Sequence, residues 1–123
     1  MVSYGDSHEL SERLIALIRR GTKTASCGAV RDYLAGEARP ELGRCDIVLD
    51  WNGVPALVLQ TLDISECRFS DVTEIMALAE GEDDDLAGWR AGHRSFFERN
   101  GGFSWDMELL FERFVLVEDL RRR

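Results

Sequence analysis

The sequence predicts an α+β fold, namely a mostly antiparallel β-barrel with helices packed over its openings. The first observation is the order of the predicted elements, which is helix, strand, hairpin, two helices and strand. The second is the lack of the regular β-α alternation that a doubly wound parallel sheet requires. The third is a β-hairpin signal in a chain of 123 residues, because a small antiparallel sheet protects its edges by closing or curving strongly. That length and an apolar content of 45% predict one domain over residues 1–123.

A helix is predicted from about residue 7 to residue 20, because its apolar residues fall on one helical face. These residues are Leu10, Leu14, Leu17 and Ile18. Asp6 or Ser7 is the expected N-cap, and Gly21 supplies the left-handed stop after the last turn. Residues 22–30 are rich in small and β-tolerant side chains and are expected to form a short strand.

A β-hairpin is predicted around Asn52-Gly53, because this dipeptide is the strongest two-residue hairpin signal. Its first strand is expected over residues 46–51 and its second over residues 54–65. Residues 31–44 contain Pro40 and Gly43 and are expected to form turns.

The C-terminal half is predicted to contain two helices and a strand. Ser70 is the expected cap of a short helix that ends near Ala79. The longer helix is expected over residues 84–99, and the final strand over residues 109–117. The inward face of the longer helix consists of Leu86, Trp89, His93, Phe96 and Phe97. His93 is therefore expected to be a packed, hydrogen-bonded histidine rather than a catalytic one.

The net charge of −8 is unevenly distributed along the chain. Residues 1–44 carry a net charge of +1, residues 45–112 one of −11, and residues 113–123 one of +2. An acidic total repels a nucleic-acid backbone, so long duplex DNA is not an expected partner. The N-terminal third can still present a local basic face, formed by Arg13, Arg19, Arg20, Lys23 and Arg31.

The three cysteines, Cys27, Cys45 and Cys67, are expected to be reduced, packed thiols of a cytoplasmic protein. Their number is odd and no C-x-x-C occurs, so neither a disulfide framework nor a zinc ribbon is predicted. No metal or other cofactor is expected. The first ten residues lack the apolar stretch of a secretory signal, so no such signal is expected. The longest aliphatic stretch, residues 56–59, is far too short for a membrane span.

Lys23 is the chain's only lysine among 15 basic residues, and it lies in Gly21-Thr22-Lys23-Thr24-Ala25-Ser26. A lysine beside a hydroxyl can act as its general base when its pKa is lowered towards neutrality. In a regular strand Lys23 and Ser26 would point to opposite faces, so they converge only if the backbone is irregular. The alternative is an ordinary helix-to-strand connection with a solvated lysine.

The run Glu80-Gly81-Glu82-Asp83-Asp84-Asp85 is the second candidate feature. Clustered carboxylates can bind a hard cation or serve as acid and base. The alternative is a solvated loop whose last aspartates cap the following helix. Glu80 and Glu82 both stay open as site residues, because the flexible Gly81 can turn either one inward.

The order of several short motifs resembles that of the ASCH domain family over nearly the whole chain. The first is the G-x-K loop, Gly21-Thr22-Lys23-Thr24-Ala25-Ser26. The others are Leu42-Gly43-Arg44-Cys45-Asp46, Val48-Leu49-Asp50, Phe69-Ser70-Asp71-Val72, Ala79-Glu80-Gly81-Glu82, Trp89-Arg90-Ala91-Gly92-His93 and Glu112-Arg113-Phe114. The opening Tyr4-Gly5-Asp6 is similar to that of a bacterial subgroup predicted to bind RNA.

The resemblance implies a PUA-like β-barrel with a cleft beside the G-x-K loop. Some small bacterial members are amidohydrolases that deacetylate acetylcytidine with a lysine, a threonine three residues later and a downstream glutamate. The matching residues here are Lys23, Ser26 and Glu82, with Ser26 in place of the threonine and Glu80 as an alternative to Glu82. Gly21, Thr22, Thr24, Arg20, Arg31 and Glu80 are the expected ligand-binding residues.

Several functions are compatible with these residues. The first is a module that binds RNA or a nucleotide in a cleft containing Lys23. The second is an amidohydrolase in which Ser26 attacks the acyl carbon, Lys23 takes its proton and Glu82 assists the amine. The third is a ribonuclease, and the fourth is a protein-interaction domain. RNA, a nucleotide or a modified nucleoside is the expected partner, and no membrane is expected.

Overall fold

The chain forms a curled five-stranded sheet in the computed structural model, which describes residues 1–122. The strands are β1 (Val2–Ser3), β2 (Ala25–Ala29), β3 (Cys45–Leu49), β4 (Pro55–Arg68) and β5 (Glu108–Asp119). Their spatial order is β1-β3-β4-β5-β2, and every neighbouring pair is antiparallel except β1 and β3. The sheet is a half-barrel with β1 and β2 at its edges, which confirms the predicted α+β, mostly antiparallel, barrel-like class.

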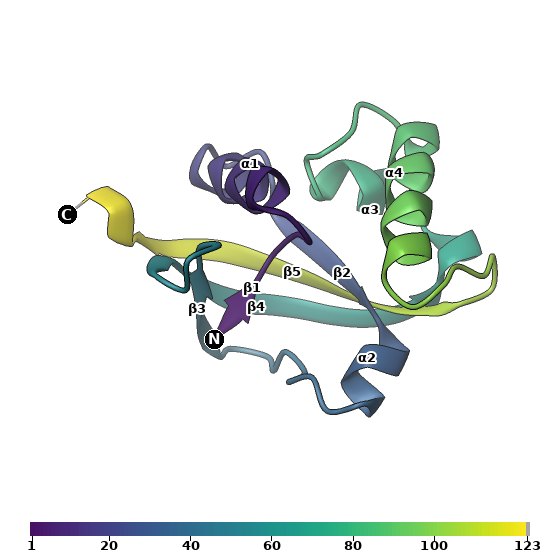
Figure 1. Ribbon diagram of the computed structural model, residues 1–123, viewed down its shortest axis with the longest axis horizontal. Coiled ribbons are helices and arrows are strands. Elements are labelled where there is room, and N and C mark those ends of the chain that lie inside the picture. The colour runs from purple at the N-terminus through teal and green to yellow at the C-terminus, as the bar shows by residue number, and fades with distance from the viewer. Residues whose placement is uncertain (123) are drawn as a thin grey trace.

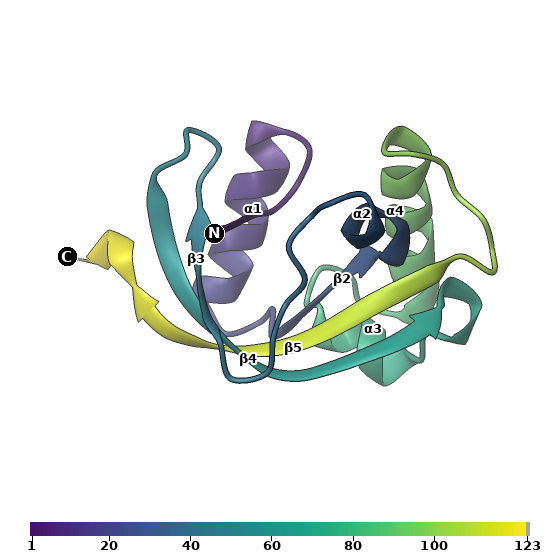
Figure 2. The same cartoon turned by 90° about the horizontal axis from the view of Figure 1, so that it is seen from below.

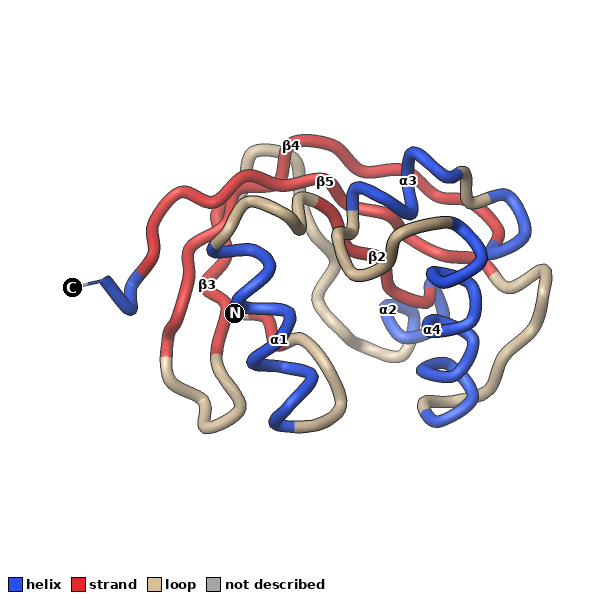
Figure 3. The backbone as a smooth tube through the Cα atoms, turned by 90° about the horizontal axis from the view of Figure 1, so that it is seen from above, coloured by secondary structure: helices blue, strands red, loops and turns tan. Residues whose placement is uncertain are grey.

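The helices cover both ends of this sheet. They are α1 (His8–Arg19), α2 (Val30–Leu34), α3 (Glu74–Ala79) and α4 (Leu86–Arg99), with short 3-10 helices η1 (Phe69–Asp71) and η2 (Leu120–Arg122). In Figure 1, α1 and α4 lie above the strands and α2 lies below them, but the edge-on view of Figure 2 shows α1, α2 and α4 together on the concave side of the sheet. The long strands β4 and β5 curve so that α1 covers one end and α3 and α4 cover the other (Figures 2 and 3). Within the described 122 residues, none of the helices has the length and apolar character needed to cross a membrane.

The predicted first helix is confirmed, and its local signals act as expected. Ser7 Oγ accepts a hydrogen bond from the Leu10 amide at 3.2 Å, which caps the N-terminus of α1. Gly21 follows the C-terminus with φ of +77°, a conformation that favours glycine.

The predicted hairpin is also confirmed, because Asn52-Gly53 joins β3 to β4. Asp50 Oδ1 accepts hydrogen bonds from the amides of Asn52 and Val54, both at 2.9 Å. Gly53 has φ of +79°, which explains why glycine stands in this turn.

Three elements differ from the sequence prediction. Ser70 lies inside η1 and does not cap α3, whose N-cap is Thr73, with Oγ1 accepting from the Met76 amide at 3.2 Å. The chain offers two hydroxyl residues three positions apart, and the later one leaves room for η1. The short strand β1 and the five-residue helix α2 were not predicted, because neither is long enough to show a period in the sequence.

The sheet carries two separate clusters of buried apolar residues, one at each end. The cluster under α1 contains Ile15, Ile18, Val48, Ala56, Leu57, Leu59 and Phe114. The cluster under α3 and α4 contains Ala29, Phe69, Val72, Ala77, Trp89, Phe97 and Leu109. Because each end has its own core, the middle of the half-barrel can hold a cavity lined with polar residues.

Candidate functional site

A cavity of about 460 Å³ lies between the two cores. Its walls come from α1, α2, α4, β1, β2, β3 and β5, from residues 37–44 and from the acidic segment after α3. Lys23, Ser26, Glu80 and Glu82 all contribute to its lining. The cavity therefore contains all three residues for which the sequence predicts a catalytic role, together with the alternative carboxylate.

Lys23 lies in an irregular connection rather than in β2. Its amide and that of Thr22 both donate to the carbonyl of Leu17, at 3.1 and 3.0 Å, so the backbone folds back onto the end of α1. The Lys23 side chain is only 1% exposed. Its Nζ lies 2.8 Å from Glu82 Oε2, 3.4 Å from Glu80 Oε1 and 3.3 Å from the Glu80 carbonyl. The lysine is therefore a buried ion-pair partner, and not a solvated loop residue.

Gly81 lets the acidic segment pass close to the lysine loop. It has φ of +71°, and a Cβ atom there would collide with the backbone carbonyl of Thr22. The Thr24 amide donates to the carbonyl of Ala79 at 2.9 Å and holds the same two segments together. As a result, both Glu80 and Glu82 contact Lys23 Nζ, and the role of either one as the site carboxylate stays a prediction.

Glu80 is the most constrained carboxylate of the site, with a side chain that is 1% exposed. Its Oε2 accepts from Trp89 Nε1 at 2.8 Å, and its Oε1 lies 3.2 Å from His93 Nε2. His93 Nδ1 lies 3.0 Å from the carbonyl of Trp89, and the two rings stack with centroids 4.1 Å apart. His93 is thus packed and hydrogen-bonded, as expected, and it also faces the cavity.

The charges of this cluster support one another. Burial alone would lower the pKa of Lys23, but the charges of Glu80 and Glu82 outweigh burial and raise it. Burial alone would raise the pKa of Glu80, but Lys23 and His93 hold that pKa well below its usual value. The pKa of His93 is raised in turn, because the hydrogen bond and charge of Glu80 outweigh the effect of burial. Lys23 is therefore an ammonium, which does not fit the role of a free-amine base for Ser26.

Ser26 lines the same cavity but belongs to a different part of its wall. It lies on β2, where its register partner across the sheet is Glu112 of β5. Among the described residues, no hydrogen bond joins Ser26 to Lys23. Side chains of such cross-strand partners lie on one face with Cβ atoms about 4.5–5.5 Å apart, so Glu112 is the ionisable neighbour of Ser26.

The other residues with a predicted ligand-binding role lie outside this cavity. Arg20, Gly21 and Thr24 line a smaller hollow of about 300 Å³ beside Phe114. Arg31 Nη2 donates to the carbonyls of Asn100 and Gly102 at 3.2 and 2.7 Å and so holds the end of α4. Thr22 is exposed and contributes its carbonyl to the contact with Gly81. Ligand binding by these residues stays a prediction.

Several cavity residues were not among the predicted site residues. The polar ones include Tyr4, Arg13, Cys27, Tyr33, Arg44, Asp46 and Glu112. Thr61 Oγ1 donates to Glu112 Oε2 at 2.5 Å, and burial raises the pKa of Glu112. One sequence signal pointed to Glu112, because it interrupts the inward apolar alternation of β5 between Leu110 and Phe114.

The ionisable lining of the cavity is mostly acidic. Seven carboxylates face it: Asp32, Glu37, Asp46, Glu80, Glu82, Asp83 and Glu112. Four strongly basic side chains face it: Arg13, Lys23, Arg44 and Arg99. This balance disfavours an anionic ligand and favours a neutral or cationic one.

Fold and site together define a small half-barrel domain with a buried lysine–carboxylate cluster at its central cavity. The chain belongs to the ASCH domain family, because the family's sequence model matches residues 1–118. It is similar to the crystal structure of an ASCH domain from Lactobacillus crispatus JV V101, with 33% identity, a TM-score of 0.86, and coverage of 94% of this chain and 77% of that chain. It is also similar to a protein from Enterococcus faecalis V583, with 32% identity, a TM-score of 0.83, and coverage of 94% and 74%. No curated protein matches the chain.

Proposed function

We propose that the chain binds a neutral nucleoside, or an unpaired base of a short RNA, in the central cavity. The observation that carries this proposal is the Lys23–Glu80–Glu82 cluster in the wall of a cavity of about 460 Å³. That volume falls within the roughly 300–1,000 Å³ of small-molecule sites.

The lining offers both hydrogen bonds and ring surfaces for a base. Glu82 supplies carboxylate acceptors for the donor groups on the edge of a nucleobase, and Lys23, whose three N–H donors bond to Glu80 and Glu82, holds that carboxylate in the wall. Glu82 is 15% exposed, against 1% for Glu80, so Glu82 is the carboxylate that can turn towards a ligand. Tyr4, Tyr33 and Phe96 also line the cavity and provide ring faces for stacking.

The acidic lining favours a ligand whose phosphates are absent or stay outside the cavity. A phosphate inside would face seven carboxylates and four cationic side chains. A nucleoside avoids this repulsion, and so does a single base turned inward from an RNA strand.

Calorimetric titration with cytidine and acetylcytidine tests the proposal. Glu82→Gln keeps the side-chain shape and is expected to weaken binding at least about tenfold, since charge-assisted hydrogen bonds are the stronger ones. Arg113→Met is the matched control, because Arg113 is exposed and does not line the cavity. Equal affinity of wild type and Glu82→Gln, or weakened binding by Arg113→Met, would contradict this site.

Hydrolysis of an acylated nucleoside is the second candidate function, and the position of Ser26 in the cavity wall favours it. Ser26 Oγ would attack the acyl carbon while its proton passes to Glu112, its cross-strand partner. The bond to the exocyclic nitrogen would then break as that nitrogen takes the proton from Glu112, and water would release acetate from Ser26.

Incubation with acetylcytidine tests this second candidate. Release of cytidine that is abolished by Ser26→Ala and retained by Ser26→Thr supports it. If no cytidine forms between pH 6 and pH 9 while the nucleoside still binds, the hydrolytic role is excluded and the binding role stands.

A further inference from the structure

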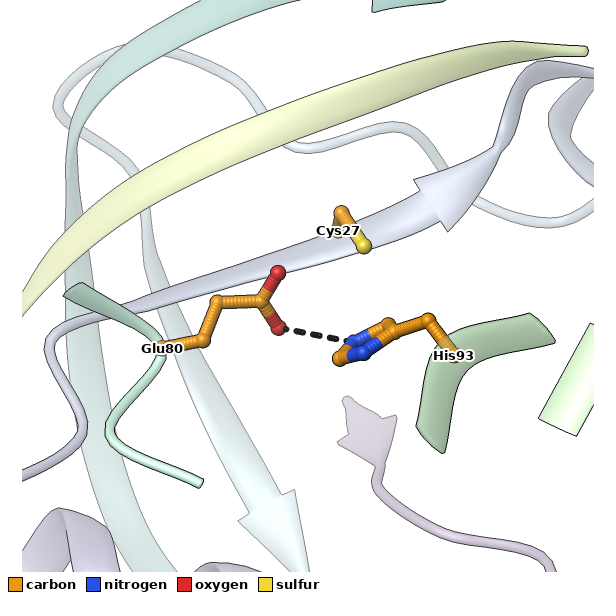
Figure 4. Close-up of side chains that lie close together, drawn as sticks. All are labelled: Cys27, Glu80 and His93. Atoms are coloured by element: carbon orange, nitrogen blue, oxygen red, sulfur yellow. Dashed lines mark hydrogen bonds and ion pairs between the residues drawn. The ribbon is translucent and has the colours of Figure 1, made fainter. Parts of the chain in front are cut away.

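We propose that Cys27, Glu80 and His93 form a binding site for a divalent transition-metal ion, for which Zn²⁺ is the chemical match. One ligand atom of each residue lies within 4.8 Å of those of the other two. The side chains point towards one another from β2, from the end of α3 and from α4 (Figure 4). Thiolate, carboxylate and imidazole together are a ligand set that Zn²⁺ accepts.

Three protein ligands would leave one position of a four-coordinate ion without a protein ligand. All three residues line the central cavity. A zinc site with three protein ligands keeps its fourth position for water or a ligand, whereas structural zinc sites have four protein ligands. The proposed ion would therefore face the cavity and would be reachable from solvent.

Contacts behind the ligands already hold two of them in the required orientation. His93 Nδ1 lies 3.0 Å from the carbonyl of Trp89, which leaves Nε2 as the nitrogen that faces the cluster. Glu80 Oε2 is held by Trp89 Nε1 at 2.8 Å, which leaves Oε1 towards His93. Metal-binding histidines and carboxylates are commonly fixed in this way through their second polar atom.

The spacing requires little movement. Glu80 Oε1 and His93 Nε2 are 3.2 Å apart. When Nδ1 carries the proton of the neutral imidazole and donates to the Trp89 carbonyl, Nε2 and Oε1 are both acceptors, and a metal ion between them would satisfy both. Ligand atoms of a tetrahedral zinc site lie about 3.3–3.6 Å apart, given zinc–ligand bonds of about 2.0–2.3 Å. Cys27 Sγ therefore has to approach by at most about 1.5 Å.

The charges around the site permit a dication despite the neighbouring ammonium. Lys23 Nζ lies 3.4 Å from Glu80 Oε1 but only 2.8 Å from Glu82 Oε2, so it can keep Glu82 when a metal takes Glu80. A divalent ion with the Cys27 thiolate, both glutamates and Lys23 forms a cluster with no net charge. Burial of such a balanced cluster avoids an uncompensated charge.

Titration of the reduced, chelator-treated chain with Co²⁺ alone tests this proposal. We expect a near-ultraviolet thiolate-to-cobalt charge-transfer band with the visible bands of four-coordinate Co²⁺, both lost when Zn²⁺ displaces it. Cys27→Ser should abolish the charge-transfer band, and His93→Gln should weaken Co²⁺ binding at least about tenfold. Cys45→Ser and Cys67→Ser are matched controls that keep all three proposed ligands and should leave the band unchanged.

Absence of the band in wild type, or its persistence in Cys27→Ser, would overturn the proposal. X-ray absorption of the Zn²⁺-loaded wild-type chain requires no variant, so it decides the matter even if a substitution prevents folding. One sulfur at about 2.3 Å with nitrogen and oxygen at about 2.0–2.2 Å supports the site, and a shell without sulfur contradicts it. Neither measurement uses a nucleoside, so these tests of the metal site are independent of the tests of the proposed function.

Discussion

Replacing Lys23 by methionine removes the ammonium that contacts both Glu80 and Glu82 while keeping an unbranched side chain of similar length. Buried Glu80 and partly exposed Glu82 then lose their principal counter-charge, while Glu80 keeps its contacts with Trp89 Nε1 and His93 Nε2. We expect a large loss of stability, because the cost comes from leaving a charge buried without a partner and not from the pair's own attraction.

The magnitude follows from burial. The side chains of Lys23 and Glu80 are each 1% exposed, and removing one partner of such a pair costs about 3–5 kcal/mol. The lower end applies here, since Glu82 is 15% exposed and can turn to water, while His93 still binds Glu80. A loss of about 3 kcal/mol corresponds to a fall in Tm of roughly 10–15 °C for a domain of this size.

Urea unfolding of wild type and Lys23→Met, followed by tryptophan fluorescence, measures this loss. Arg39→Met is the matched control, because Arg39 pairs with Glu66 at 2.6 Å but the two side chains are 48% and 54% exposed. That substitution should cost at most about 1 kcal/mol. Adding Glu80→Gln to Lys23→Met should recover part of the loss by removing the unpaired charge. If Lys23→Met unfolds within about 1 kcal/mol of wild type, the reasoning from burial is refuted.

Two further predictions concern Glu112 in the cavity wall and Gly81, which lies between Glu80 and Glu82. Burial raises the pKa of Glu112 above its ordinary value of 4.5, so ionisation of this carboxyl group destabilises the folded state as pH rises. Glu112→Gln can still accept a hydrogen bond from Thr61 and carries no charge. This substitution should therefore raise Tm at pH 7 by about 2–5 °C. Thermal unfolding below pH 4 should show no such gain, and a gain independent of pH would contradict this cause. Gly81→Ala should lower stability by more than Gly43→Ala in urea unfolding, because only at Gly81 would the new Cβ collide with Thr22, although φ is +71° and +78° respectively. Equal losses of stability in the two variants would contradict the role of the Thr22 contact, because the positive φ of each glycine would then explain the whole loss.

The sequence predicts those elements that carry several local features, such as a capping residue, an apolar face or a turn dipeptide. α1 and the β3–β4 hairpin follow from a cap, an apolar stripe and a turn dipeptide. α4 begins where the acidic run ends, with Asp85 Oδ1 accepting from the Gly88 amide at 2.7 Å. β1 could not be predicted, because its two residues form a strand only through parallel pairing with β3.

The site was only partly predictable for a related reason. Lys23 stands out as the only lysine, and the acidic run stands out by composition. Their contact spans 57 residues and depends on the close passage at Gly81, which no local pattern shows. Cys27 and His93 were expected to be packing residues, because their separate elements converge only in the folded chain.

The central claim is that the cavity accepts a neutral nucleoside and disfavours an anion. Calorimetric titration of the wild-type chain with cytidine and with cytidine 5′-monophosphate at low ionic strength tests it most directly, since fixed charges are least screened there. We expect cytidine to bind severalfold more tightly than the monophosphate, and we expect the difference to shrink as salt is added. Tighter binding of the monophosphate at low salt would contradict it.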